Sequence, residues 1–328
     1  MQQLVVLFFS AFFLSSFFVN PTITQSYLID GASLFFYCVF PSLFTFTFII
    51  NLLKLFKADN LIVKLLYKPL NRIFKLNSNS CYPVFVGLTS GYPMSAKAIV
   101  DETKNGNLTL YDVYVTYALN SISNPLFIIV TVGGTMLNSV PYGIILMLSQ
   151  YITALINGLF YSKILKNKSK YTDSKNSIVS LSNSNETLLS VMQNTVNSAL
   201  IVFGFICIFN LIIEVFSAYK IIDFFSKILS NIFTLLSVPK PYSTPLVISF
   251  FEITKGLKLL SLLTENIRLT LCISSGLLYF GGACIFFQSL AFLSTLNVKL
   301  SKLILIKITG TVIAPVICIL LCLIFGIK

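Results

Sequence analysis

The sequence contains no histidine and no tryptophan, and only 10% of its residues are charged. Without histidine the chain lacks the commonest metal ligand and general base, so histidine-dependent catalysis is excluded. The seven cysteines are not spaced as C-x-x-C, so we expect them to be packing residues rather than a zinc or redox site. Walker and dinucleotide-binding glycine patterns are also absent. The sequence thus shows no nucleotide-binding motif, and energy for any process that needs it would have to come from an ion gradient or from the gradient of a solute.

Enzyme chemistry has little support in what remains. A serine near a lysine, as in Ser95 and Lys97, is an arrangement that can support hydrolysis. The chain has no G-x-S-x-G elbow and no pair of catalytic carboxylates to accompany it. We therefore expect no enzyme activity, no metal and no cofactor.

Hydrophobic residues make up 56% of the chain, and its mean hydropathy is +0.87. This composition predicts an all-α polytopic membrane protein, with the lipid bilayer as its main surroundings. Runs long enough to cross a bilayer lie at 4–19, 32–53, 111–132, 141–165, 199–216, 267–293 and 303–327. Two further apolar stretches, 81–100 and 243–263, are interrupted by glycine, proline and charge, and we expect them to enter the membrane without crossing it.

The net charge of +12 comes from basic residues that are dispersed over short loops, which argues against nucleic acid as a partner. Lysines gather at 52–76 and 163–175, and the positive-inside rule places both segments in the cytoplasm. Two crossings precede the first of them, so the N-terminus is also predicted to be cytoplasmic. The first run lacks a basic start and a small-x-small cleavage site, so we predict an uncleaved N-terminal transmembrane helix at 1–26.

A polar segment rich in lysine, serine and asparagine divides the chain into two halves. We predict a cytoplasmic linker at 163–190, a first repeat at 27–162 and a second repeat at 191–328. Each half contains an interrupted apolar hairpin followed by a long helix with a break. With the linker in the cytoplasm, the two hairpins enter from opposite sides. The prediction is two inverted repeats, each with a re-entrant helical hairpin and a discontinuous transmembrane helix, as in secondary transporters.

Glycine and proline residues mark the hairpin tip and the interruptions of the long helices in the sequence. The first hairpin carries "GLTSGYPMSAK" at 87–97, and the long helices are interrupted at 124–125 (Asn-Pro) and at 281–282 (Gly-Gly). Thr109 and Thr264 are predicted to cap the starts of those helices, and Asp112 completes a capping box with Thr109. Unwound backbone at membrane depth has to line a polar cavity or lie within protein.

We therefore expect a binding site for a small polar solute where the hairpin tips and the breaks meet. Glu252 is its principal charge, with Lys255 and Lys258 near enough in sequence to neutralise it; the alternative is an ion pair at the outer surface. Lys97 either faces the cavity or extends to the cytoplasmic surface. Asn120, Asn124 and Gln288 either bind the solute or join helices. The full predicted set is Ser90, Gly91, Pro93, Ser95, Lys97, Asn120, Asn124, Glu252, Thr254 and Gln288.

Five motifs resemble one known family. They are "FPSLFTF" (40–46), "SGYPMSAK" (90–97), "NSISNPLFI" (120–128), "FEITKG" (251–256) and "FGGACIFFQ" (280–288), and together they resemble the YlbJ family of sporulation integral membrane proteins. The resemblance implies nucleoside-recognition or Gate domains, which are similar to part of the concentrative nucleoside transporters. It also implies a role in spore formation and cortex assembly, in a membrane derived from the mother cell.

Two functions remain open at this point. One is a transporter of a small polar solute, nucleoside-like or other, coupled to Na⁺ or H⁺ or to neither. The other is a non-transporting scaffold that organises a sporulation complex. Polar residues at membrane depth favour the transporter, and self-association into a homo-oligomer is compatible with both.

Overall fold

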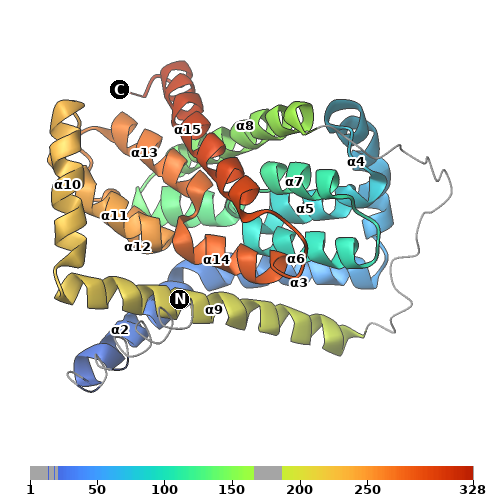
Figure 1. Cartoon of the computed structure of the whole chain (residues 1–328), viewed down its shortest axis with the longest axis horizontal. Helices are drawn as coiled ribbons and strands as arrows, with labels where there is room; N and C mark the ends of the chain where they lie inside the picture. The colour runs from blue at the N-terminus through green and yellow to red at the C-terminus, as the bar shows by residue number, and fades with distance from the viewer. Residues whose placement is uncertain (1–13, 15–17, 19–20, 166–186, 328) are drawn as a thin grey trace.

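The structure, a computed structural model, describes residues 14, 18, 21–165 and 187–327. All regular elements among these residues are helical, which confirms the predicted all-α class (Figure 1). In the first half they are α2 (Pro21–Leu34), the π-helix η1 (Phe35–Val39), α3 (Phe40–Leu55), α4 (Asp59–Phe74), the 3₁₀ turn η2 (Ser78–Ser80), α5 (Cys81–Ser90), α6 (Tyr92–Lys104), α7 (Leu110–Leu119), the π-helix η3 (Phe127–Met136) and α8 (Val140–Ile164). In the second half they are α9 (Leu188–Ala218), α10 (Ile221–Leu235), the 3₁₀ turn η4 (Lys240–Tyr242), α11 (Ser243–Phe251), α12 (Ile253–Leu260), α13 (Ile267–Phe280), α14 (Gly282–Leu293) and α15 (Leu300–Ile324).

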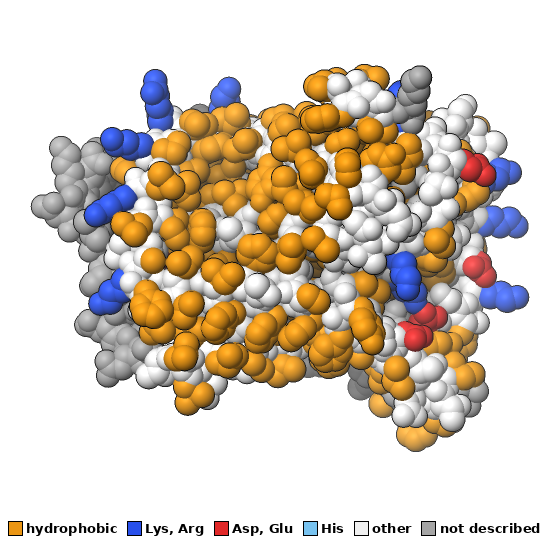
Figure 2. Space-filling model, turned by 180° about the vertical axis from the view of Figure 1, so that it is seen from behind, with side chains coloured by type: hydrophobic (Ala, Val, Ile, Leu, Met, Phe, Trp, Pro, Cys, Tyr) orange, Lys and Arg blue, Asp and Glu red, His pale blue; other side chains and the backbone are white. Residues whose placement is uncertain are grey.

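Five helical segments among the described residues are long and apolar enough to cross a membrane. They are α2 to α3 (Pro21–Leu55), α8, α9, α13 with α14 (Ile267–Leu293), and α15. In Figure 2, hydrophobic side chains cover most of the visible face, and Lys and Arg lie toward its two ends. This distribution supports a multi-pass membrane protein. The predicted N-terminal helix, 1–26, lies mostly outside the described residues.

The predicted crossing at 111–132 is not a single helix. α7 ends at Leu119, an irregular segment follows, and η3 begins at Phe127. Neither piece is long enough alone to span a bilayer. The interruption that the Asn-Pro pair predicts is therefore confirmed, and it falls earlier in the helix than the pair itself.

Both interrupted hydrophobic stretches fold as helical hairpins. α5 and α6 meet at Gly91, which has a φ of +82°, a value that favours glycine, and Pro93 follows in the first turn of α6. α11 and α12 meet at Glu252, the one residue between them, which has an extended backbone. Each hairpin therefore turns within a single residue.

The second long helix is also interrupted. Gly281 adopts a left-handed conformation between α13 and α14 and ends α13 in the way that is typical of a C-terminal glycine. The caps at the helix starts were only partly predicted. The capping box of Thr109 and Asp112 is confirmed, whereas α13 is capped by Asn266, whose side chain accepts the Leu269 N–H, and not by Thr264.

The halves share their order of elements. In each, an amphipathic helix (α4 or α10) leads through a 3₁₀ turn into a hairpin, an interrupted helix and a long closing helix. α4 and α10 lie at opposite ends of the molecule (Figure 1). The hairpins and the interrupted helices lie between them, so the two unwound regions are brought to the middle of the protein.

Candidate functional site

A small cavity of about 60 Å³ lies where the two hairpin tips meet. Its lining comes from α3, both hairpin tips, the first break, η3, α9 and α14. We call it the inner cavity, and it is lined by Val39, Ser42, Leu43, Ser90, Gly91, Tyr92, Pro93, Ser123, Asn124, Phe127, Val202, Ile206, Glu252, Ile253, Thr254, Ile285 and Gln288. The predicted meeting of the hairpin tips is therefore present in the structure.

The first hairpin tip fits directly into the break of the first long helix. The backbone N–H of Tyr92 donates to the carbonyl of Ile122 at 3.1 Å. A methyl group added at Gly91 would lie 2.8 Å from the backbone nitrogen of Asn124, closer than real side chains approach. Glycine at this position allows the two unwound backbones to approach and satisfy each other.

The second break fits against the second hairpin in the same way. Gly282 has a φ of +71°, and a methyl group there would lie 2.8 Å from the carbonyl oxygen of Ser249 and 3.4 Å from the Ile253 nitrogen. Tyr92 connects the two arrangements, since its hydroxyl lies 2.5 Å from Ser123 Oγ and donates to the Leu278 carbonyl at 3.2 Å. Each tip thus contacts its own break, and Tyr92 joins the two halves.

Glu252 is buried, with 1% of its surface exposed, and it caps the N-terminus of α12. One carboxylate oxygen accepts the Thr254 N–H at 3.0 Å and the other accepts the Lys255 N–H at 2.7 Å. An extended residue with a side-chain acceptor is what a helix start requires, and the partial positive charge of that end favours a carboxylate.

The Lys255 ammonium group makes its direct contacts away from Glu252: it forms an ion pair with Glu214 of α9 and donates to Asn210 Oδ1 at 3.0 Å. Backbone amides make the direct contacts that compensate the Glu252 charge, and the predicted attraction of Lys255 is a smaller contribution. The same ion pair gives Glu214 of α9 a partner on α12.

Three buried polar atoms that line the inner cavity have no hydrogen-bond partner among the described residues. They are Ser90 Oγ, Asn124 Nδ2 and Gln288 Oε1. The rest of the Asn124 side chain is engaged, because its Oδ1 accepts the Leu126 N–H at 2.8 Å and so caps the helix that follows. Buried polar groups are normally paired, so these atoms are an unpaired donor, acceptor and hydroxyl on residues that line one cavity.

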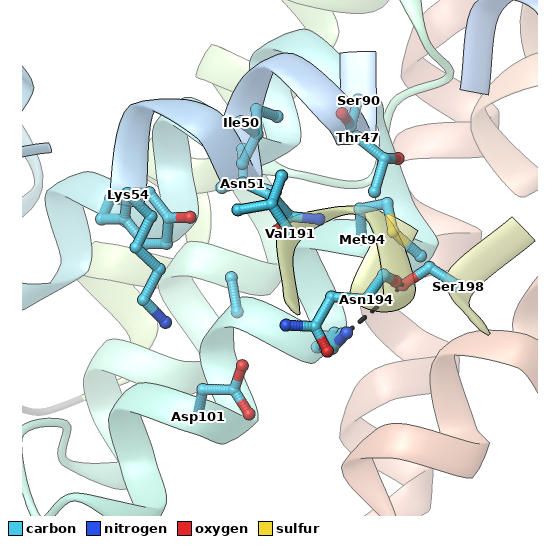
Figure 3. Close-up of a pocket in the computed structure, with 14 residues that line it drawn as sticks. Thr47, Ile50, Asn51, Lys54, Ser90, Met94, Asp101, Val191, Asn194 and Ser198 are labelled. Carbon is cyan, nitrogen blue, oxygen red and sulfur yellow. Dashed lines mark hydrogen bonds between the residues drawn. The ribbon is translucent and has the colours of Figure 1, made fainter. Parts of the chain in front are cut away.

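A second, larger cavity of about 270 Å³, which we call the vestibule, lies beside the inner one and shares Ser90 with it. This vestibule is lined by polar residues of α3, α6 and α9, of which Asp101 and Asn194 are exposed (Figure 3). Lys97 lies in its wall and donates to Ser198 Oγ at 3.2 Å. Ser90 lines both spaces, so the vestibule and the inner cavity approach each other at the end of α5.

The ten predicted site residues differ in which cavity they line. Seven line the inner cavity: Ser90, Gly91, Pro93, Asn124, Glu252, Thr254 and Gln288. Lys97 lines the vestibule instead. Ser95 and Asn120 line neither, because the Ser95 hydroxyl donates to the Tyr92 carbonyl and the Asn120 amide donates to the Pro83 carbonyl.

The sequence prediction missed two contributors, Tyr92 and Lys307. Tyr92 lines the inner cavity beside Gly91 and Pro93 of the hairpin tip, and this position next to predicted residues was a signal for it. Ser123, which the sequence predicts either to bind the solute or to join helices, also lines the cavity. Lys307 is buried behind Tyr92, and a single lysine inside a long apolar run was the signal for it. Among the described residues, no group of three or more His, Cys, Asp or Glu side chains is arranged to hold a metal ion.

Two helical hairpins, each fitted to an interrupted helix beside one shared cavity, together with five helical segments long enough to cross a bilayer, support a polytopic helical membrane protein. The chain is 24% identical over 308 residues to the sporulation integral membrane protein YlbJ of Bacillus subtilis (strain 168), a match that covers 89% of this chain and 76% of that protein. This similarity confirms the resemblance to the YlbJ family that the motifs indicate. No family model and no solved structure matches the chain.

Proposed function

We propose that the protein is a sporulation-associated membrane transporter of a small polar solute. The similarity to a sporulation integral membrane protein supports the first part. The observation that carries the second is the inner cavity, whose lining residues from both hairpin tips, the first break and α14 include a buried carboxylate and three polar atoms without a partner. The volume of about 60 Å³ is smaller than a nucleoside or an amino acid needs, so the tips have to separate when the solute binds.

The two halves act as inverted repeats in this proposal. The vestibule shares Ser90 with the inner cavity and is lined by Lys54 of the lysine-rich segment 52–76, so in this proposal it opens to the cytoplasm. Outward movement of the first hairpin would open the cavity to the vestibule. The second hairpin would serve the opposite side in the same way, which gives alternating access around a fixed site.

The solute contacts follow from the polar atoms in the cavity. Asn124 offers an amide N–H group, Gln288 offers an amide oxygen, and Ser90 can donate or accept. Glu252 and the free helix ends at the breaks suit donor groups of the solute or a coupling ion, Na⁺ or H⁺. We place the N-terminus in the cytoplasm, the protein in a membrane derived from the mother cell, and its physiological role in cortex assembly.

Uptake into proteoliposomes tests this proposal. Purified protein is screened with radiolabelled nucleosides, amino acids and cortex precursors, with and without Na⁺ and pH gradients. Gln288→Met keeps the side-chain volume and removes the amide that faces the cavity, so it should lower uptake at least tenfold.

Ser289→Ala is the matched control, because the Ser289 hydroxyl is also buried without a partner but does not line the inner cavity. This variant should transport like the wild type. If no solute in the screen is taken up, while sporulation depends on the protein and tolerates Gln288→Met, the scaffold function replaces transport.

A further inference from the structure

Lys307 lies near the middle of α15, inside the protein, with 1% of its surface exposed. A lysine in such a place carries a large free-energy penalty unless its charge is compensated. The one ion pair in the described part of the chain joins Lys255 and Glu214, so no carboxylate in that part serves Lys307. The compensation has to come from other groups.

Those groups are a helix end and three aromatic rings. Lys307 Nζ donates to the carbonyl of Tyr279 at 3.2 Å. Tyr279 is in the last turn of α13, where carbonyl groups lack partners in their own helix and the helix dipole is negative. The Nζ atom lies 4.2 Å from the centre of the Tyr92 ring, 5.9 Å from that of Tyr117 and 6.0 Å from that of Tyr279. All three distances are within the range of cation–π attraction.

The carbonyl and the three rings around Lys307 Nζ are groups that attract a small cation. The C-terminal end of a half-helix at a break is a place where transporters bind a coupling ion. Here the ring at 4.2 Å belongs to Tyr92, which forms the tip of the first hairpin and lines the inner cavity, whereas the carbonyl belongs to the second half. A cation at this point therefore attracts the two halves to each other.

We propose that the break after α13 is a binding site for a monovalent cation, and that Lys307 occupies it with its own ammonium group. The tethered cation holds the Tyr92 tip against the second half, so this arrangement of the hairpins requires no Na⁺ at that position. Its consequence for transport rests on the proposed function, whereas occupation of the site by a cation does not.

The test uses thermal unfolding of the purified full chain in detergent, without any solute. Lys307→Ala empties the site, and methylammonium chloride is then added as a substitute for the missing group. We expect Lys307→Ala to unfold at a lower temperature than the wild type, and methylammonium at saturation to raise its Tm by about 5 °C. Tetramethylammonium chloride at equal concentration, which is too large for the site, should give no rise.

Lys302→Ala is the matched control, because Lys302 lies on the same helix with its Nζ 4.8 Å from the centre of the Tyr114 ring, but at a partly exposed position. Neither this variant nor the wild type should respond selectively to methylammonium. A Lys307→Ala protein that shows no selective rise overturns the proposal.

Lys307→Met provides a second measurement if the alanine variant does not fold. It fills the same volume without a charge, and a Tm equal to that of the wild type would also overturn the proposal. Since none of these measurements uses transport, a failure to detect uptake leaves the result intact, and the reverse also holds.

Discussion

Replacing Glu252 by glutamine tests two roles of this residue, as the N-terminal cap of α12 and as the charge of the proposed transport site. Glutamine keeps the length of the side chain but has one acceptor oxygen where the carboxylate has two. Both carboxylate oxygens accept a backbone N–H, at 3.0 Å and 2.7 Å. One of these donors would therefore face the amide NH₂ group and lose its partner at a site with 1% exposure. An unsatisfied buried donor costs about 1–3 kcal/mol, so we expect a loss of about 2 kcal/mol.

The assay combines thermal unfolding in detergent with uptake into proteoliposomes. Glu252→Gln should lower the Tm by several degrees and should abolish uptake, because the cavity loses its charge. Glu252→Asp separates the two effects. Aspartate is a preferred N-cap and keeps the charge, but it withdraws the carboxylate from the cavity by one methylene group. This variant should therefore keep the wild-type Tm while its uptake falls.

Two results would refute the reasoning. If Glu252→Gln unfolds at the wild-type temperature, the carboxylate does not stabilise α12 as its cap. If Glu252→Asp and Glu252→Gln both transport normally, the residue does not contact the solute, and the transport site lies elsewhere.

Gly282→Ala should destabilise the protein by about 3 kcal/mol, because it combines backbone strain with a clash against the second hairpin. Gly106 has a similar φ but no neighbour within 4 Å, so Gly106→Ala should cost only about 1–2 kcal/mol. Equal losses of Tm in the two variants would contradict the close fit at Gly282. Lys255→Met should lower stability by about 1–2 kcal/mol, because it leaves Glu214 unpaired. Adding Glu214→Gln should restore most of that loss. Additive effects of the two substitutions in a double-mutant cycle would show that the pair is not coupled. Lys240 lies beside the second hairpin. In a protein without native cysteines, Lys240→Cys should react with an impermeant maleimide only from outside the cell. Labelling from the cytoplasmic side would exclude inverted repeats.

The parts of the fold that could be predicted have local causes. Gly91 and Gly282 mark a hairpin tip and a break because their φ values of +82° and +71° favour glycine, and that preference is visible in the sequence. The capping box of Thr109 and Asp112 is equally local, since both partners lie within one helical turn. Membrane insertion follows from composition alone.

The parts that could not be predicted depend on distant partners. Thr264 and Asn266 can both cap a helix, and tertiary packing decides where α13 begins. Lys255 lies close to Glu252 in sequence, yet its side chain contacts Glu214 on another helix. The surroundings of Lys307 come from three tyrosines, all outside its own helix, so a charge in an apolar run indicates an unusual site without indicating its partners.

The contacts that join the two halves also determine the order in which the protein can be assembled. The Tyr92 hydroxyl donates to a carbonyl that is 186 residues later in the chain, and the Tyr114 hydroxyl accepts a backbone N–H that is 185 residues later. Translation at about 5–20 residues per second separates the synthesis of such partners by roughly 10–40 seconds. During that interval the first hairpin lies in the membrane with polar groups whose partners have not been made. The first half therefore reaches its final packing only after α13 and the start of α15 have been made.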